Sequence, residues 1–546
     1  MDKILFIVPP YPNFDSFVNP GFNERVVVKK SGNYGNVVTD MPMGLLSISA
    51  YLKKNAEVQT KLIDFNVILN KIDDFKYNSF SELFLEILSE KEWVNFNPDI
   101  IGISALFAPS YKNMLDVADI SRKIFPNAII IAGGGAASNM YKQIFKDSSA
   151  FDALCYGEGE KPILGLVKTS DKKEFLKSNP SWITKEKTGP FQYDFIENLD
   201  EIPFPDYDLL ETGQSKLSPS IDTFTSFDNK KNYFPYSTSR GCPHKCCFCA
   251  SHSIHGRKMR YHSLERLKED FMRLKEQYGA QTIAFLDDNI MLDRKRALKI
   301  IDLAKELKLN IFFLTGLALY ALDKEMLSAI KSAGVNEITL AIESGSDRVL
   351  KDVMHKPLTL SIIKQVVADC RALGIYTDAN ILIGLPGETK KDIEDTRLFL
   401  RNLDIAWIRI YIATPLVGSE LFDLCIKNNY LTGDYTDSDF KNAVIETPDF
   451  TAEYIQEKAY SLNLEINFVQ NSDFRLGNYA KALEGFENAM RIKNDHAFAY
   501  YFSAKCCKLL GLSEKYSVYK DKYKKIIEES KIWRNYAKQF NLPALV

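Results

Sequence analysis

Residues 239–249 read SRGCPHKCCFC and hold four of the nine cysteines of the chain. Three of them, Cys242, Cys246 and Cys249, form a C-x3-C-x2-C pattern. Three thiolates on one short loop can each bind an iron of a cubane [4Fe–4S] cluster, and the fourth iron then has no protein ligand. An iron with an open coordination position can bind a further molecule. The spacing therefore predicts a catalytic iron–sulfur centre held by these three cysteines.

A zinc site is the alternative for this segment. Cys247, His244 or His252 would then supply a fourth ligand beside the triad. Structural zinc sites usually combine two ligand pairs that lie far apart in the sequence. Cys506 and Cys507 are adjacent and fall in a helical pattern, so no second pair has a suitable spacing. We favour the cluster and expect Cys247 not to be a ligand.

Alternating strand and helix patterns continue from residue 233 to about residue 430. Six β–α units predict an incomplete TIM-like barrel, a partial (β/α)6 fold, over residues 233–450. Periodicity alone leaves a second open α/β sheet as an alternative. The predicted strands are 232–239, 282–288, 311–317, 337–344, 378–384 and 407–414, and the predicted helices are 262–279, 294–308, 323–334, 360–374 and 390–402.

Residues 1–160 show a similar alternation before the barrel. Short β-rich runs that end in Gly, Pro or Ser, with helical stretches between them, predict a doubly wound parallel sheet. Ligands bind beyond the carboxyl ends of the strands in such sheets. The candidate ligand-binding loops are therefore Pro9–Tyr11, Ser104–Ser110 and Gly133–Ser138. The predicted strands are 4–10, 58–66, 99–106, 128–135 and 153–160, with a helix at 43–54.

The remaining segments are a polar, proline-broken stretch at 161–232, predicted as a linker, and a helical tail at 451–546. Leu476-Gly477 and Leu510-Gly511 stand 34 residues apart, with small and aromatic residues between them. This period is typical of a tetratricopeptide (TPR) helix pair. Such repeats usually need several copies for stability, so an ordinary helical cap on the barrel is the alternative.

Composition excludes several classes of protein. Lysine and arginine total 69 against 71 aspartate and glutamate, a formal charge of −2, which excludes a chain-wide basic face for nucleic acid though not a local patch. We expect no specific nucleic-acid partner. No apolar run is long enough to cross a bilayer, and the N-terminus lacks the layout of a cleavable signal. We expect a cytoplasmic protein with no transmembrane segment.

The cysteine segment and the strand ends after it resemble the radical S-adenosylmethionine (SAM) superfamily. The resemblance rests on SRGCPHKCCFC, FLDDN (285–289), AIESGS (341–346), IGLPGET (383–389) and ATPLVGS (413–419). It implies that SAM binds the open iron and is cleaved to a 5′-deoxyadenosyl radical. By this resemblance Cys242, Cys246 and Cys249 hold the metal, and the SAM contacts are Phe248, Asp287, Asp288, Glu343, Ser344 and Gly384.

The N-terminal segment resembles the cobalamin-binding domain of B12-dependent radical SAM enzymes. MPMGLLSISAYL (41–52), AGGGAAS (132–138) and CYGEGE (155–160) carry the resemblance. No histidine precedes His244, so this domain supplies no histidine to the lower face of a cobalamin. By resemblance the cobalamin contacts are Pro9, Tyr11, Gly44, Leu45, Ser104, Leu106, Gly133, Gly134, Gly135, Gly157 and Glu158.

The pattern of this domain has two other interpretations. The glycines also suit a nucleotide, but no GxGxxG with a downstream acid follows the first strand. The second alternative is a domain that has lost cobalamin and keeps only its fold, and the sequence leaves this alternative open.

The resemblance implies a methyltransferase that acts on an unactivated carbon through a 5′-deoxyadenosyl radical and methylcobalamin. The alternatives are a cobalamin-assisted cyclase or oxidative enzyme, and, far behind them, a scaffold built on the tail. A methylthiotransferase is disfavoured because only Cys155 precedes Cys242, whereas that family has a second triad there. The implied partners are a small-molecule, lipid or peptide substrate, an external electron donor of the flavodoxin or ferredoxin type, and a protein partner docked on the tail.

Overall fold

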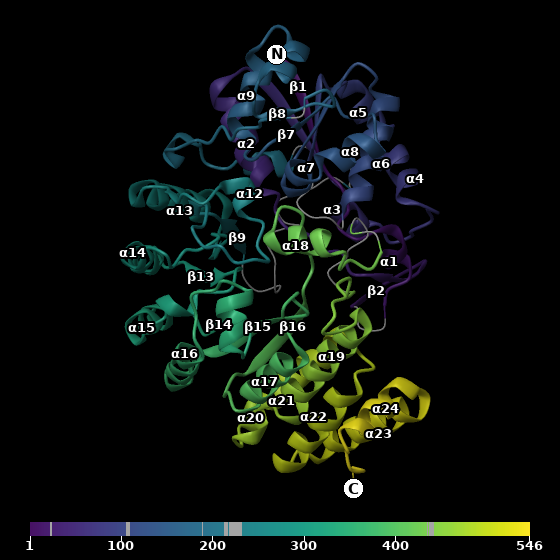
Figure 1. The fold of residues 1–546 in the computed structure, drawn as a ribbon, viewed down its shortest axis with the longest axis vertical. Helices are drawn as coiled ribbons and strands as arrows, with labels where there is room; N and C mark the ends of the chain where they lie inside the picture. The colour runs from purple at the N-terminus through teal and green to yellow at the C-terminus, as the bar shows by residue number, and fades with distance from the viewer. Residues whose placement is uncertain are drawn as a thin grey trace.

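The computed structural model describes residues 1–21, 25–104, 110–187, 189–211, 217, 232–433, 435 and 442–545. Three parts follow one another along the long axis of the molecule (Figure 1). An N-terminal α/β part lies at one end, a barrel-like part lies in the middle, and a helical tail lies at the other end. The two termini are therefore at opposite ends of the molecule.

The N-terminal part is built on a six-stranded sheet in the order β4-β1-β5-β6-β7-β8. All neighbours are parallel except β7 and β8. Residues 4–8 of β1 are buried, as expected for a central parallel strand covered on both faces. The chain order reverses between β1 and β5, which creates a crevice at the carboxyl ends of these strands. The strands are β1 (Asp2–Val8), β4 (Val58–Asp64), β5 (Ile100–Ser104), β6 (Ile129–Gly133), β7 (Ala153–Cys155) and β8 (Trp182–Ile183).

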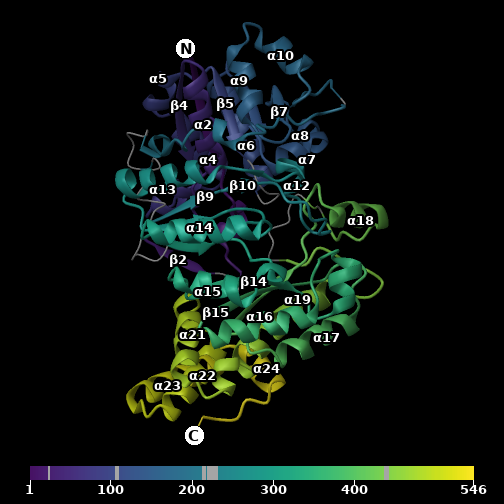
Figure 2. The same ribbon diagram turned by 90° about the vertical axis from the view of Figure 1, so that its left-hand side faces the viewer.

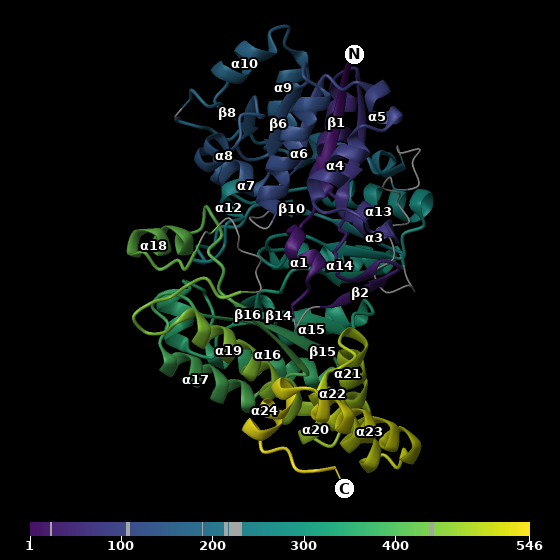
Figure 3. The ribbon, with the colours of Figure 1, turned by 90° about the vertical axis from the view of Figure 1, so that its right-hand side faces the viewer.

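Helices cover both faces of this sheet, and a small antiparallel hairpin projects toward the barrel (Figure 3). The hairpin is β2 (Val26–Lys29) and β3 (Gly32–Gly35). The helices are α1 (Phe14–Val18), α2 (Met43–Asn55), α3 (Phe65–Lys71), α4 (Phe80–Leu88), α5 (Lys91–Phe96), α6 (Tyr111–Ile124), α7 (Gly135–Asn139), α8 (Tyr141–Asp147), α9 (Glu160–Lys168) and α10 (Lys172–Ser178).

The predicted linker at 161–232 needs a correction at its start. Residues 161–187 contain most of α9, all of α10 and strand β8, which pairs with β7 and so extends the N-terminal sheet. These elements were missed because β8 has two residues and the helices are short, so no clear periodicity develops. Beyond them the described chain is mostly irregular, with short helical turns η2 (Leu199–Glu201) and η3 (Tyr207–Glu211).

The middle part contains the six parallel strands expected for a partial barrel. They form two three-stranded sheets, β13-β12-β9 and β14-β15-β16, and a parallel bridge between Leu317 and Leu340 connects the two. A separate antiparallel pair, β10 (Ser239–Arg240) and β11 (Arg260–Tyr261), follows the first strand. The barrel strands are β9 (Tyr233–Tyr236), β12 (Thr282–Phe285), β13 (Asn310–Phe313), β14 (Glu337–Glu343), β15 (Tyr376–Ile383) and β16 (Trp407–Ile412).

The barrel helices begin where the sequence supplies caps. Ser263, Asp293 and Asp323 each accept a hydrogen bond from a first-turn N–H, and Thr389 forms a capping box with Asp392. Helices α13, α14 and α15 lie in chain order between the N-terminal part and the tail (Figure 2). The helices of this part are α12 (His252–His255), α13 (Leu264–Tyr278), α14 (Arg294–Glu306), α15 (Lys324–Ser332), α16 (Leu360–Ala372), α17 (Lys390–Arg401) and α18 (Glu420–Asn428), with η4 (Leu319–Ala321) and η5 (Val349–Val353).

The tail is helical, as predicted, and it closes the free edge of the last barrel strand. The side-chain amide of Asn467 accepts from the backbone N–H of Ile408 at 2.8 Å and donates to its carbonyl at 2.7 Å. A side chain thus satisfies backbone groups that a missing seventh strand would leave unpaired. The tail elements are α19 (Ala452–Leu464), η7 (Glu465–Val469), α20 (Ser472–Arg475), α21 (Tyr479–Ile492), α22 (Ala497–Leu509), α23 (Ser513–Glu529) and α24 (Lys531–Gln539).

The residues of the predicted TPR pair occupy α21 and α22, which pack closely against each other. Ala482 and Phe486 of α21 are buried in the core of the tail, together with Cys506 and Cys507. Within the described part of the chain, no helix is both long enough and apolar enough to pass through a bilayer.

Candidate functional site

The cysteine loop leaves the barrel at Arg240, the end of β10, and returns at Arg260, the start of β11. Gly241 has φ +95°, a left-handed conformation that side chains disfavour. A Cβ at this position would also collide with the carbonyl oxygen of Lys258. The glycine therefore lets the two ends of the loop approach each other closely, which narrows the loop at its base.

The three predicted metal ligands share one environment. Cys242, Cys246 and Cys249 are partly exposed free thiols on this loop. Burial raises the pKa values of Cys242 and Cys246, and the charge of Cys249 raises both further. Three accessible sulfur donors on one tight loop fit a cubane cluster with an open iron. The ligand assignment stays a prediction.

Cys247 is placed differently from its neighbours. Its side chain is buried and contributes to the main hydrophobic core. Its backbone N–H donates to the carbonyl of Met354 at 3.1 Å, and its own carbonyl accepts from Leu421 at 2.9 Å. Leu421 belongs to α18, which lies close to α12 in Figure 3. This placement agrees with the prediction that Cys247 is not a ligand.

No three His, Cys, Asp or Glu side chains of the described residues are grouped so that they could hold a single metal ion. A cubane cluster distributes its ligands over separate irons, so this geometry leaves the cluster prediction untested.

The two predicted aspartates after β12 have different surroundings. Asp287 is buried, and its carboxylate accepts from the Thr238 N–H at 3.1 Å, the Thr238 hydroxyl at 2.7 Å and the Ser239 hydroxyl at 2.5 Å. These bonds tie β12 to the strand that enters the cysteine loop. Asp288 is exposed, lines a large cavity, and its charge helps to raise the pKa of Cys242. Of the two, Asp288 is free to contact SAM.

The two predicted SAM contacts after β14, Glu343 and Ser344, also differ in their surroundings. Glu343 ends the strand at φ +69° and forms an ion pair with Lys356 at 3.3 Å, and both side chains are mostly buried. Its negative charge also raises the pKa of Cys246, after burial and the nearby thiols, so Glu343 lies toward the cysteine loop. Ser344 is buried and shares a hydrogen bond with Thr396 of α17 at 3.2 Å. Ser344 therefore attaches the loop after β14 to helix α17.

The last two predicted SAM contacts are Phe248 and Gly384. Phe248 is partly buried against the main hydrophobic core. Gly384 has φ +90°, and a Cβ here would lie 2.9 Å from Cγ2 of Ile455 on α19. The tail thus packs directly on the loop that follows β15.

A cavity of about 910 Å³ lies between the N-terminal sheet and the barrel. This volume is near the upper end for small-molecule pockets and suits a bulky ligand. Pro9 and Gly135 are not among its lining residues, and Leu106 lies outside the described residues. The predicted cobalamin contacts that line it are Tyr11, Gly44, Leu45, Ser104, Gly133, Gly134, Gly157 and Glu158.

The cavity wall suits a large ligand that approaches the backbone. A Cβ added to Gly44 would meet no atom within 4 Å, so the cavity has room at this point. Burial, followed by the charges of Asp64 and Asp40, raises the pKa of Tyr11 and keeps its phenol a hydrogen-bond donor. The residues present therefore fit cobalamin, although the individual contacts stay predictions.

Two barrel histidines, His255 and His262, line the same cavity from the opposite side. His262 contacts Asp200 at 3.3 Å, and burial lowers its pKa to about 4. The absence of histidine from the N-terminal segment therefore does not keep imidazoles away from the cavity, because the barrel supplies them.

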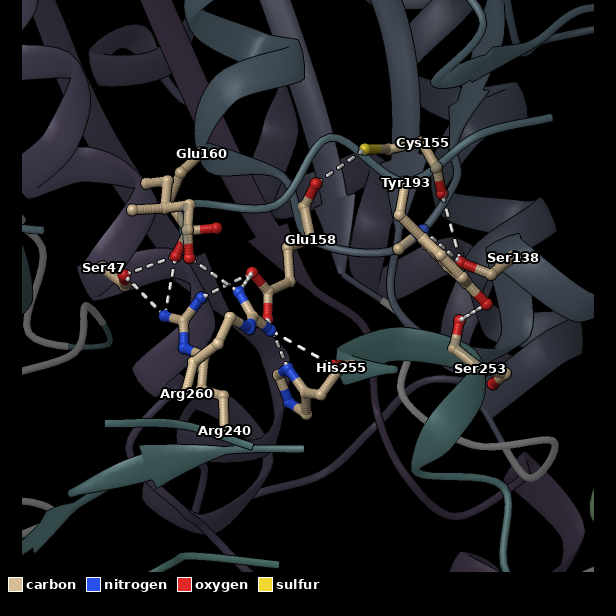
Figure 4. A network of polar contacts seen from close by, with 12 residues as sticks. Ser47, Ser138, Cys155, Glu158, Glu160, Tyr193, Arg240, Ser253, His255 and Arg260 are labelled. Carbon is tan, nitrogen blue, oxygen red and sulfur yellow. Dashed lines mark hydrogen bonds and ion pairs between the residues drawn. The ribbon is translucent and has the colours of Figure 1, made fainter. Parts of the chain in front are cut away.

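A buried ionic network joins the cavity wall to the base of the cysteine loop (Figure 4). Glu158 accepts from both terminal nitrogens of Arg260, at 2.6 and 2.9 Å, and lies 3.2 Å from Nη1 of Arg240. His255 contacts the same carboxylate at 2.7 Å. Burial alone would raise the pKa of Glu158, but Arg240, His255 and Arg260 hold it well below its usual range. The carboxylate is thus charged and fully engaged.

A second carboxylate extends this network. Glu160 contacts Arg240 at 2.8 Å and accepts from the Ser47 hydroxyl at 2.6 Å. Sequence reasoning selected Glu158 only as a cobalamin contact and missed Arg240, Arg260 and Glu160. The sequence did hold one indication of this network, Arg240 immediately before Gly241 and Cys242, because a buried charged side chain beside a metal-binding loop needs a partner of opposite charge.

The chain matches two family models. The model described as the radical SAM superfamily matches residues 236–400, and the model described as the B12 binding domain matches residues 33–167. The first covers most of the barrel with its cysteine loop, and the second covers most strands of the N-terminal sheet.

Known proteins and solved structures resemble this chain over most of its length. An uncharacterised methyltransferase of Pyrococcus horikoshii is 29% identical over 84% of this chain and 91% of its own length. Cytidylyl-2-hydroxyethylphosphonate methyltransferase of Streptomyces wedmorensis is 26% identical over 78% of this chain and 86% of its own. The structure of OxsB, a cobalamin-dependent SAM radical enzyme, superposes with a TM-score of 0.63 at 15% identity, over 99% of this chain and 83% of that one.

The predicted fold class is therefore confirmed, and so are the predicted cofactors, a [4Fe–4S] cluster, SAM and cobalamin, as those of the two domains present. The chain therefore carries a B12-binding domain followed by a radical SAM domain.

Proposed function

We propose that the protein is a cobalamin-dependent radical SAM methyltransferase that acts on an unactivated carbon. The observation that carries this proposal is the shared wall between the two predicted cofactor sites. Asp288 lines the large cavity and also lies near Cys242, and Arg240 lines the cavity immediately before the cysteine loop begins. A molecule bound at the loop would thus face one bound in the cavity.

When bound, the cluster and SAM supply a 5′-deoxyadenosyl radical, and cobalamin supplies a methyl group. The chain holds and separates these groups. Cys242, Cys246 and Cys249 bind the metal, Asp288 and Glu343 orient SAM beside them, and the crevice between β1 and β5 receives the corrin. The N-terminal sheet and the barrel enclose the cavity from both sides, which limits water near a reactive radical.

A radical SAM enzyme of this type needs an external reductant and a small-molecule substrate. A flavodoxin or ferredoxin is the proposed donor, in a cytoplasmic setting. A protein partner on the helical tail, and a lipid or peptide as the substrate, also remain proposals.

The test is to count both by-products of SAM. The purified protein is reconstituted anaerobically with iron, sulfide and hydroxocobalamin, then reduced with SAM and candidate substrates present. A methyltransferase must form S-adenosylhomocysteine and 5′-deoxyadenosine, because one SAM loses its methyl group and another its adenosyl group. Omission of cobalamin should abolish the first product alone. Formation of 5′-deoxyadenosine with little S-adenosylhomocysteine would instead indicate a cyclase.

A further inference from the structure

We propose that Glu158 is a positioning residue that fixes the cysteine loop at a set place relative to the cobalamin cavity. This inference rests on the proposed function, since it assigns to Glu158 the spacing between two cofactors. The sequence pointed to Glu158 as a direct cobalamin contact, whereas its carboxylate faces the barrel arginines (Figure 4).

The base of the cysteine loop is an antiparallel pair whose two strands are held by one carboxylate. Arg240 and Arg260 are direct cross-strand partners in β10 and β11. Both guanidinium groups reach Glu158, which belongs to the N-terminal part, in the loop between β7 and α9. Any shift of the loop relative to Glu158 would therefore break ion pairs on both of its strands at once.

Because the ion pairs of Glu158 are buried, they favour one position of the cysteine loop. The side chains of Glu158 and Arg260 are 3% and 2% exposed. Buried ion pairs add little stability compared with apolar packing, because desolvation offsets their attraction. They do penalise displacement, since a shifted partner leaves a charge unpaired in a medium of low dielectric constant. Such a network therefore suits the setting of a position better than general stabilisation.

The other end of Glu158 is anchored in the cavity wall. Gly157 and Gly159 flank it, and all three residues line the cavity. The Glu158 carbonyl accepts from the thiol of Cys155, the last residue of β7, at 3.7 Å. The chain thus runs from a strand of the cobalamin sheet, through two residues, to the carboxylate that holds the cysteine loop.

Two further contacts support the same alignment. Glu160 binds Arg240 and Ser47 of α2, whose first turn includes the cavity residue Gly44. On the far side of the loop, Asn139 of α7 donates to the Ser253 hydroxyl of α12 at 2.8 Å. The cysteine loop is therefore tied to the N-terminal part before and after the cysteines.

The test compares Glu158→Gln with Glu197→Gln in the full-length protein. Glu197 forms an exposed ion pair with Lys258, on the returning side of the same loop, and it lies outside the cavity, so it is a matched control. Hydrogen–deuterium exchange of the metal-free protein is measured over residues 239–262. Iron content and both SAM by-products are measured after reconstitution. The ratio of S-adenosylhomocysteine to 5′-deoxyadenosine reports methyl transfer between the two sites relative to chemistry at the loop alone.

We expect Glu158→Gln to keep its iron and form 5′-deoxyadenosine within about threefold of the unmodified protein. The by-product ratio should fall at least tenfold and exchange at 239–262 should rise, whereas Glu197→Gln changes neither. Glu158→Asp, which keeps the charge but has a shorter reach, should give an intermediate ratio. An unchanged ratio would overturn the proposal. So would loss of iron or of the fold in both Glu158 variants, which would assign the network to stability alone. If the unmodified protein makes no S-adenosylhomocysteine, the proposed function fails instead. In that case, equal exchange at 239–262 in Glu158→Gln and in the unmodified protein would overturn the positioning role as well.

Discussion

The backbone N–H of Gly384 donates to the buried carboxyl group of Glu388 at 2.7 Å. Both residues lie in the loop after β15, where sequence similarity predicts a SAM contact. The second carboxyl oxygen of Glu388 has no hydrogen-bond partner among the described residues, and the side chain is fully buried. Because Ile455 of α19 packs against Gly384, the loop is held from inside by a carboxyl group and from outside by the tail.

This arrangement predicts a pH dependence of stability. Burial raises the pKa of Glu388 to about 8 from an ordinary value of 4.5. Between these two values the unfolded chain loses the proton and the folded chain keeps it, so the free energy of unfolding falls as the pH rises. We expect the thermal midpoint of the metal-free protein to fall between pH 5.5 and pH 8, and Glu388→Gln to reduce this slope.

Glu453→Gln, which removes an exposed carboxylate at the start of α19, is the control and should leave the slope unchanged. Equal slopes for the unmodified protein and Glu388→Gln would show that Glu388 is ionised in the fold across this range.

The cysteine assignment predicts a sharp difference between adjacent residues. Cys242→Ala, Cys246→Ala or Cys249→Ala should each abolish bound iron and the absorbance near about 400 nm typical of thiolate-bound clusters. Cys247→Ala should retain both, at some cost in stability, because this thiol is buried in the core. Iron analysis and absorption spectroscopy after anaerobic reconstitution provide the measurement. Equal iron loss in the Cys247 variant would mean that the ligand triad is assigned wrongly.

The two aspartates after β12 should respond differently to substitution. Asp288→Asn should weaken SAM binding by about 1.5–3 kcal/mol, the range for a hydrogen bond to a charged group, without changing the thermal midpoint. Asp287→Asn should lower the thermal midpoint, because Asp287 accepts three hydrogen bonds from Thr238 and Ser239. Calorimetric titration of the cluster-loaded protein with SAM, beside thermal unfolding, separates the two effects. Normal SAM affinity in Asp288→Asn would leave this carboxylate without a role in the site.

Cobalamin uptake should depend on free space at Gly44. Gly44→Phe should fill part of the cavity and reduce uptake of hydroxocobalamin at least tenfold, since a side chain there would project into open space. Gly44→Ala is the matched control and should preserve uptake, with a helix stabilised by roughly 0.5–1 kcal/mol. Absorption spectra after gel filtration measure the bound corrin. Full uptake by Gly44→Phe would place the corrin elsewhere.

Much of the architecture could be predicted because it depends on local patterns. The six barrel strands and their five following helices appear at the expected segments, since apolar runs and caps act within a few residues. The start of the predicted linker was wrong, because β8 has only two residues and is defined by its pairing with Cys155 and Leu154 rather than by its own pattern.

The sequence by itself determined the spacing from which the cysteine triad is predicted, because cluster ligands on one short loop need only a fixed spacing and no distant partner. It also determined the parallel sheets, whose buried strands require continuous apolar runs. Only the tertiary structure decided which acids are available to ligands. Asp287 and Asp288 are neighbours in the chain, but one is enclosed by hydroxyl groups and the other faces a cavity. Likewise, Glu158 binds arginines about 80 and 100 residues away, since charges pair according to their separation in space and their burial, neither of which a linear pattern encodes.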